Sequence, residues 1–134
     1  MNPTEMCVFC KIIKGEAPSY KVYEDDEFFG FLDIYPRTKG HSLLIPKKHY
    51  QWVYDIPNFD EYWMAVLKLT KAIKIALSPF FITYVTHGLE IAHAHVHILP
   101  RTHEDTSFVP DVKQISKEDM KKIADTILQA VETL

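Results

Sequence analysis

Three histidines at positions 93–97 alternate with apolar residues, in the order His-Ala-His-Val-His. Successive side chains of a β-strand point to opposite faces, so this alternation predicts a strand over 94–99. The three histidines then share one face, and the apolar residues between them face the core. Neighbouring rings would start about 6.6 to 6.8 Å apart, which lets two or three of them contact one phosphate-sized group. The fold must therefore bury one face of this strand and open the other to solvent or to a ligand.

A lone histidine is usually structural, but three at this spacing are difficult to explain by core packing. Imidazole titrates near pH 6.5, so at neutral pH one ring can act as a nucleophile or base while another is charged. One strand could thus carry a nucleophile, a proton donor and a cation that stabilises phosphate. The spacing also fits a zinc enzyme, in which two histidines of the strand bind the metal together with a ligand from elsewhere.

The rest of the pattern predicts an α+β fold in one domain that spans residues 1–134, since 47% hydrophobic residues are enough for one core. Alternating or β-branched runs predict five strands, over 21–24, 28–33, 41–46, 80–86 and 94–99. Long helices are expected over 60–77, where Pro79 enforces the stop, and after an N-cap at Ser116. A short helical turn is expected over 9–14. The strands mostly follow one another without intervening helices, which favours an antiparallel sheet over a doubly wound one.

Each long helix has an apolar stripe that predicts its buried face. In the first helix the stripe comprises Trp63, Val66, Leu67, Thr70, Ile73, Lys74 and Leu77, with the lysine as a polar exception. In the last helix it comprises Met120, Ile123, Ala124, Ile127, Leu128 and Val131.

Cys7 and Cys10 are the only cysteines, and they are separated by two residues. Three interpretations are open: two buried small apolar residues, a redox pair, or two zinc ligands. A redox pair normally lies at a helix start in a βαβ unit, which this pattern does not predict. In a reducing compartment the spacing favours metal binding over a structural disulfide.

The formal net charge of −3 and the lack of a long basic stretch argue against a general nucleic-acid-binding protein. No apolar run approaches the roughly 20 residues that cross a bilayer. Residues 1–5 lack the basic and apolar parts of a signal peptide. We therefore expect a cytoplasmic protein that is not bound to a membrane.

Several motifs together resemble the histidine-triad (HIT) superfamily. Residues 93–99 match its His-φ-His-φ-His-φ-φ signature, where φ is an apolar residue. Further matches keep the order of the family: CVFCKIIKGE at 7–16, VYED at 22–25, FLDI at 31–34, GHSLLIPKKH at 40–49 and Pro-Arg at 100–101. This combination of motifs is highly specific and covers roughly residues 7 to 101.

The resemblance implies a five-stranded antiparallel sheet with one long central helix and a C-terminal helix, usually paired into a homodimer. It also implies purine nucleotide substrates, either nucleoside phosphoramidates or dinucleoside polyphosphates. His95 would be the nucleophile that forms a covalent nucleotidyl-histidine. His97 would contact the phosphate oxygens and help the leaving group depart. His41 would support the triad, and His93 completes it.

The resemblance also implies the other binding residues. Asp33 would accept hydrogen bonds from the ribose hydroxyls, and Phe31 and Ile34 would line the base pocket. Some relatives with this N-terminus hold a structural zinc, and no organic cofactor is expected. The zinc ligands would be Cys7, Cys10, His49 and His93.

The segment before the triad departs from the family pattern. Leu89 stands where many relatives have Gln, Glu90 stands where a phosphate-contacting Ser or Thr often lies, and the segment is several residues shorter. A carboxylate near a phosphate is unfavourable unless it is turned away or paired. A nucleotide-binding regulatory module without efficient turnover is therefore the alternative to a hydrolase. Arg101 could neutralise a polyphosphate tail, or it could be an ordinary exposed arginine.

Overall fold

The computed structural model describes residues 6–134. Residues 1–5, on which the expectation of no signal peptide rests, lie outside the described residues. None of the described helices is long and apolar enough to cross a membrane.

Five strands form one antiparallel sheet in the order β1-β2-β3-β5-β4. The strands are β1 (Lys21–Glu24), β2 (Phe28–Leu32), β3 (Ser42–Pro46), β4 (Phe81–Val85) and β5 (Val96–Arg101). The helices are α2 (Val8–Ile13), α3 (Phe59–Leu77) and α4 (Lys117–Glu132), with a short 3-10 turn, η1, at Val53–Asp55. The predicted α+β fold is confirmed.

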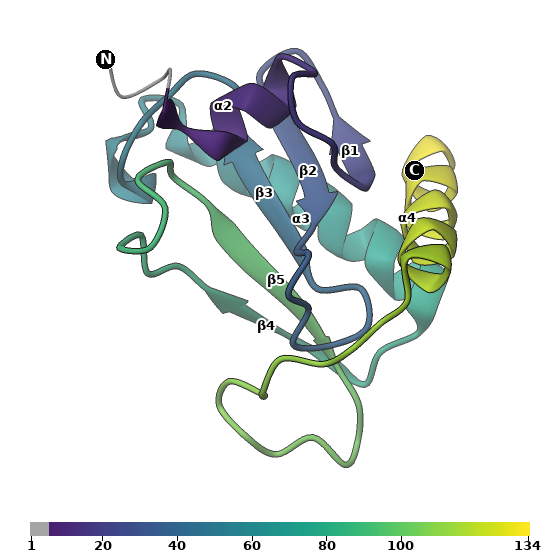
Figure 1. Cartoon of the computed structure of the whole chain (residues 1–134). Helices are drawn as coiled ribbons and strands as arrows, with labels where there is room; N and C mark the ends of the chain where they lie inside the picture. Colours follow the sequence, from purple (N-terminus) through teal and green to yellow (C-terminus); the bar gives the residue numbers. More distant parts are fainter. Residues whose placement is uncertain (1–5) are drawn as a thin grey trace.

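The two faces of the sheet are covered differently. The long helix α3 crosses one face, and α4 packs beside it against β1 (Figure 1). The side chains of β2 alternate between two apolar clusters: Phe28 and Leu32 join the core beneath α3, while Phe29 and Phe31 pack with α2. Because α2 is short, it covers only one end of its face, and the rest of that face carries the site described below.

The strand predicted over 94–99 begins later, at Val96, and continues to Arg101. Two hydrogen bonds explain the shift. The backbone N–H of Ala94 donates to the carbonyl of Tyr50 at 2.7 Å, outside the sheet. The Nδ1–H of His95 donates to the carbonyl of His93 at 2.7 Å, so this carbonyl bonds to a side chain within the same segment. The apolar residues of this segment nevertheless face the core as predicted, since Ala94, Val96 and Ile98 are buried.

The predicted buried face of α3 is partly wrong, whereas that of α4 is largely confirmed. Val66, Thr70 and Ile73 are buried as expected, but Leu67 is 39% exposed. The remaining buried positions are Tyr62, Ala65, Leu69 and Ala72. The Tyr62 hydroxyl donates to the carbonyl of Leu44 at 2.7 Å, so a residue with a polar tip can face the sheet. In α4 Met120, Ile123, Ala124 and Ile127 are buried, and the Ser116 side chain caps the helix by accepting from the Asp119 N–H.

Gly40 precedes His41 and adopts a φ of +87°, where an added Cβ would lie 2.3 Å from Cδ1 of Leu77. We expect Gly40→Ala to lower the free energy of unfolding by about 2 to 3 kcal/mol, because the backbone would be strained and the Leu77 side chain would have to move. Gly15→Ala is the matched control, since Gly15 has a φ of +78° but nothing within 4 Å of an added Cβ. Its expected loss is about 1 kcal/mol. Urea denaturation measures both, and equal losses would contradict the role assigned to Leu77.

Candidate functional site

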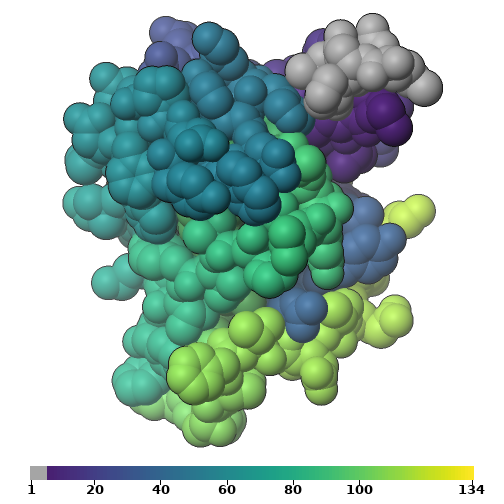
Figure 2. All heavy atoms as spheres, turned by 90° about the vertical axis from the view of Figure 1, so that its left-hand side faces the viewer, coloured from purple at the N-terminus to yellow at the C-terminus, as the bar shows by residue number. Residues whose placement is uncertain are grey.

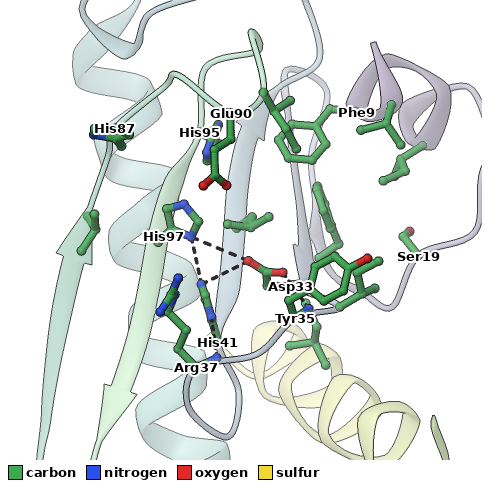
Figure 3. Close-up of a pocket in the computed structure, with 18 of the residues that line it drawn as sticks. Phe9, Ser19, Asp33, Tyr35, Arg37, His41, His87, Glu90, His95 and His97 are labelled. Carbon is green, nitrogen blue, oxygen red and sulfur yellow. Dashed lines mark hydrogen bonds and ion pairs between the residues drawn. The ribbon is translucent and has the colours of Figure 1, made fainter. Parts of the chain in front are cut away.

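A cavity of about 690 Å³ opens on the sheet face opposite α3. Its walls come from α2, the ends of β2 and β5, the loop before β3, the segment around residues 87–91 and the loop after β5. The residues on this wall are mostly apolar, but one side carries a group of histidines and carboxylates (Figure 3). A second group, of cysteines and histidines, lies where α2 meets the segment before β5.

His95 is held in one tautomer. Its Nδ1 lies 2.7 Å from the carbonyl oxygen of His93, which can only accept, so Nδ1 carries the proton and Nε2 keeps its lone pair. Burial lowers the pKa of His95, so the ring is neutral at neutral pH. The ring of Phe9 meets it edge-to-face at 5.4 Å between centroids. These contacts give a neutral, oriented imidazole on the cavity wall, which is what a nitrogen nucleophile requires.

His41 and His97 form a chain of two neutral rings. The backbone N–H of Arg37 donates to Nδ1 of His41 at 3.1 Å, so the proton of a neutral His41 lies on Nε2. That Nε2–H donates to Nδ1 of His97 at 2.9 Å, which leaves the proton of His97 on its own Nε2. The Nε2 of His97 is the nitrogen turned towards His95 and Glu90 (Figure 3). Burial lowers the pKa of His41 to about 3 and that of His97 to about 4, and the positive charge of Arg37 lowers both further.

Asp33 lies beside this pair, directly after β2. Its Oδ2 is 3.5 Å from Nε2 of His41 and 3.9 Å from Nδ1 of His97. Because both rings are neutral at neutral pH, neither approach is an ion pair. Its Oδ1 accepts from the Tyr35 N–H at 2.9 Å, and burial raises the pKa of the carboxyl group. The three side chains are near enough to share a metal ion, but the proton on Nε2 of His41 occupies the position that a metal would need.

The four residues predicted as zinc ligands are brought together. The Sγ of Cys7 lies 3.3 Å from Nδ1 of His93, and the Sγ of Cys10 lies 3.3 Å from Nδ1 of His49 and 3.5 Å from that of His93. Tetrahedral zinc with ordinary bond lengths separates a sulfur and a nitrogen ligand by about 3.6 Å. The Nε2–H of His93 donates to the carbonyl of Pro46 at 2.8 Å, so its Nδ1 lone pair faces the cysteines. These residues could hold a metal ion.

The thiols of this cluster are shielded from water. Both cysteines are buried and neither forms a disulfide. Burial raises the pKa of Cys10 to about 11, so its thiol keeps its proton until a metal displaces it. The cluster also connects directly to His95, because His93 supplies both a potential ligand nitrogen and the carbonyl that orients the His95 ring.

The remaining expected residues lie at different depths. Phe31 is buried in the cavity wall, whereas Ile34 is 62% exposed at its rim. Glu90 is exposed, and its carboxylate faces the gap between His95 and His97 (Figure 3). Leu89 is exposed and is not among the residues that line the cavity.

A family model described as the HIT domain matches residues 14–104. The chain belongs to the HIT domain family. It is 37% identical to the protein of Bacillus subtilis named "Protein hit", over 92% of this chain and 99% of that protein. It is 35% identical to an adenosine 5′-monophosphoramidase of Saccharomyces cerevisiae, over 77% of this chain and 67% of that protein.

Two solved structures share the fold of this HIT domain. A hypothetical histidine triad nucleotide-binding protein of Sulfolobus tokodaii superposes with a TM-score of 0.85 at 34% identity, over 96% of this chain and 93% of that chain. A zinc-bound histidine triad family protein of Mycobacterium smegmatis superposes with a TM-score of 0.78 at 29% identity, over 97% of this chain and 96% of that chain.

The structure contradicts both expectations for Arg101 in this HIT domain. It is 1% exposed and does not line the cavity, so it is neither an ordinary surface arginine nor available to a polyphosphate there. Its guanidinium donates to the carboxylate of Asp105 and to the carbonyls of Ser107 and Phe108. The side chain can be buried because the loop after β5 supplies these partners. Arg101 therefore anchors that loop.

No sequence pattern predicted that the loop after β5 forms part of the cavity wall. Val109 and Val112 line the cavity from the loop after β5, which has no regular secondary structure. The guanidinium of Arg37 donates to the carbonyl of Pro110 at 2.7 Å and ties this loop to the middle of the loop between β2 and β3. The tie joins positions 73 residues apart, and no local pattern predicts such a contact.

The neutral His41 makes stability depend on pH. In the unfolded chain this ring takes up a proton near pH 6.5, but in the folded HIT domain only near pH 3. The unfolded state therefore binds more protons below pH 6.5, and folding stability falls as the pH falls. Between pH 7 and pH 5 we expect His41 to contribute a loss of about 2 kcal/mol. Urea denaturation of the wild type and of His41→Gln at both pH values measures this, and an equal loss in both proteins would contradict it.

Proposed function

We propose that the chain is a nucleotide hydrolase acting at the α-phosphorus of a purine nucleoside phosphoramidate or a dinucleoside polyphosphate. The reaction proceeds through a covalent nucleotidyl-histidine intermediate on His95. The observation that carries this proposal is the state of that ring: it is neutral, its Nδ1 proton is donated to the His93 carbonyl, and its Nε2 lone pair is free. The relative named adenosine 5′-monophosphoramidase supports the same reaction class.

The two steps balance without a further reactant. In the first, the Nε2 lone pair of His95 forms a bond to phosphorus, and the bond to the leaving group breaks. The leaving group keeps that electron pair and takes a proton from solvent. In the second, water attacks phosphorus, the N–P bond breaks, and its electron pair returns to Nε2 with release of the nucleoside monophosphate and a proton. The Nε2–H of His97 donates to a phosphate oxygen as negative charge develops there, and His41 holds that ring in place.

The cavity is arranged to bind a nucleotide. Phe31 and Ile34 supply apolar contacts for the base, and Asp33 accepts hydrogen bonds from the ribose hydroxyls. Apolar walls with one polar anchor are typical of small-ligand sites. Glu90 lines the same cavity, and we propose that it lies next to the bound phosphate.

We propose that Cys7, Cys10, His49 and His93 bind a structural zinc ion. Two sulfur and two nitrogen ligands form a closed tetrahedral site, which leaves no position for substrate. The zinc would thus take no part in the chemistry, and would hold α2 and the segment before β5 together. No organic cofactor enters the proposed reaction. Two free thiols fit a reducing compartment, and we place the protein in the cytoplasm.

The test uses an adenosine 5′-phosphoramidate and a diadenosine polyphosphate as substrates. We expect turnover of at least one of them, and an acid quench should trap an adenylyl group that peptide mass spectrometry locates on His95. Turnover that survives chelation of zinc would exclude a zinc hydrolase. Nucleotide binding without turnover of either substrate would instead support the regulatory module.

We propose that two copies of the chain pair along the edge of the sheet at β4. Among the described residues β4 pairs only with β5, and Figure 2 faces this side of the molecule. Phe81 and Tyr84 are 37% and 43% exposed on this strand. We expect light scattering to give twice the chain mass of 15.6 kDa. Tyr84→Glu should shift the protein to the monomer, while Phe108→Glu, at a 98% exposed loop position, should not.

A further inference from the structure

The charged groups around the cavity are unequally distributed. Two carboxylates line it, from Asp33 and Glu90, and among the described residues Arg37 is the only lysine or arginine that does so. Burial also keeps His41 and His97 neutral at neutral pH, because it lowers the pKa of both rings. Among the described residues, the cavity therefore lacks the cluster of lysines and arginines that a polyphosphate chain would need.

Arg37 already has a hydrogen-bond partner for its guanidinium. The guanidinium of Arg37 donates to the carbonyl of Pro110 at 2.7 Å, and its charge offsets part of the rise that burial causes in the pKa of Asp33. Glu90 has no such partner: within the part of the chain that the structure describes, it forms neither an ion pair nor a side-chain hydrogen bond.

Glu90 lies on the solvent side of the reacting groups. Its carboxylate faces the gap between His95 and His97 (Figure 3), and its negative charge adds to the rise that burial causes in the pKa of Asp33. Asp33 lies deeper, with a side chain that is 18% exposed, whereas Glu90 is exposed. A leaving group must depart towards solvent, so it passes the carboxylate of Glu90 while the nucleoside stays between the inner walls.

We infer that Glu90 selects substrates by the charge of the leaving group. It favours nucleoside 5′-phosphoramidates whose leaving amine carries a second, positively charged amino group, and it disfavours polyphosphate leaving groups. Opposite charges attract more strongly at the mouth of a partly dry cavity than in bulk water, and like charges repel more strongly. The inference rests on the proposed function for its reaction: the P–N bond breaks, its electron pair stays on the amine nitrogen, and that nitrogen takes a proton from solvent. Glu90 transfers no proton and binds the distal ammonium.

Two adenosine 5′-phosphoramidates of equal size test this selectivity. One carries 1,3-diaminopropane as its leaving amine, and the other carries n-butylamine, which lacks the second charge. For the wild type we expect kcat/KM to be about tenfold higher with the diamine, a difference of about 1.4 kcal/mol. Glu90→Gln keeps the shape and removes the charge, so the ratio should fall to about one and hydrolysis of a diadenosine polyphosphate should rise about tenfold. Glu132→Gln, at an exposed position on α4, is the matched control and should keep the wild-type ratio.

A binding measurement separates this inference from the proposed hydrolysis. In a His95→Ala background, calorimetry with the same two phosphoramidates needs no turnover, and the diamine should bind about tenfold more tightly at low salt. This preference should shrink as salt is added and disappear in the double variant with Glu90→Gln. Equal binding of the two compounds, or a preference that survives Glu90→Gln, would overturn the inference. A Glu90-dependent preference without any turnover by the wild type would overturn the hydrolase proposal alone.

Discussion

Replacing His95 with alanine should lower hydrolysis of an adenosine 5′-phosphoramidate by about 10⁴-fold or more, the scale seen when a catalytic nucleophile is removed. The loss follows because, among the described histidines that line the cavity, only His95 has an Nε2 lone pair that a hydrogen bond from its own Nδ1 holds in place. The Nδ1 of His97 accepts from His41, and that of His41 accepts from the Arg37 N–H. Single-turnover assays with purified protein give the rates, and adduct formation is scored on the same samples.

His97→Asn is the matched control for this prediction. Asparagine can still donate towards a phosphate oxygen, so we expect a smaller loss of about 10²- to 10³-fold, the scale of one lost transition-state hydrogen bond. The adenylyl adduct should still form in this variant, whereas His95→Ala should form none. Turnover near the wild-type rate by a folded His95→Ala protein would exclude the nucleotidyl-histidine mechanism.

Replacing Cys10 with serine should remove the bound zinc and destabilise the fold. One of four proposed ligands is lost, and a buried polar group faces the two histidines left behind. Loss of a structural metal belongs with the largest effects of single substitutions, and we expect at least about 4 kcal/mol. For a chain of this size that corresponds to a fall in Tm of roughly 10 °C. Metal content per chain and thermal unfolding measure the two effects.

His103→Gln is the control for the zinc prediction. His103 is an exposed histidine that stacks on Phe80 at 3.7 Å between centroids, away from both clusters. Its replacement should leave the zinc content unchanged. The free energy of unfolding should change by no more than about 0.5 kcal/mol. A Cys10→Ser protein that keeps one zinc ion per chain would show that the four residues do not form the metal site.

The order of the elements was predictable because it depends on local patterns. Alternation of apolar residues located the strands, the stripe of α4 identified its buried positions, and Ser116 marked its first turn. The face of α3 was harder to predict, since Tyr62 is buried only because the carbonyl of Leu44 accepts its hydroxyl proton. Local spacing contains no information about that partner.

For the candidate site, the sequence predicted the residues but not their arrangement in space. The histidine run, the two cysteines and the family motifs pointed from sequence alone to residues that line the cavity and to the four residues of the cysteine–histidine cluster. Their placement needed the fold, because Cys7 and His93 are 86 positions apart, and His41 and His97 are 56 apart.

The residue types and the local periodicity determined which side chains could react, and only the tertiary structure decided their state. Two of the imidazole protons are set by long-range partners: the Pro46 carbonyl for His93 and the His41 ring for His97. The same packing buried Arg101 outside the cavity and left Glu90 without an ion-pair partner among the described residues. Proton positions and local charge depend on burial and on hydrogen bonds between distant segments, and neither quantity exists until the chain has folded.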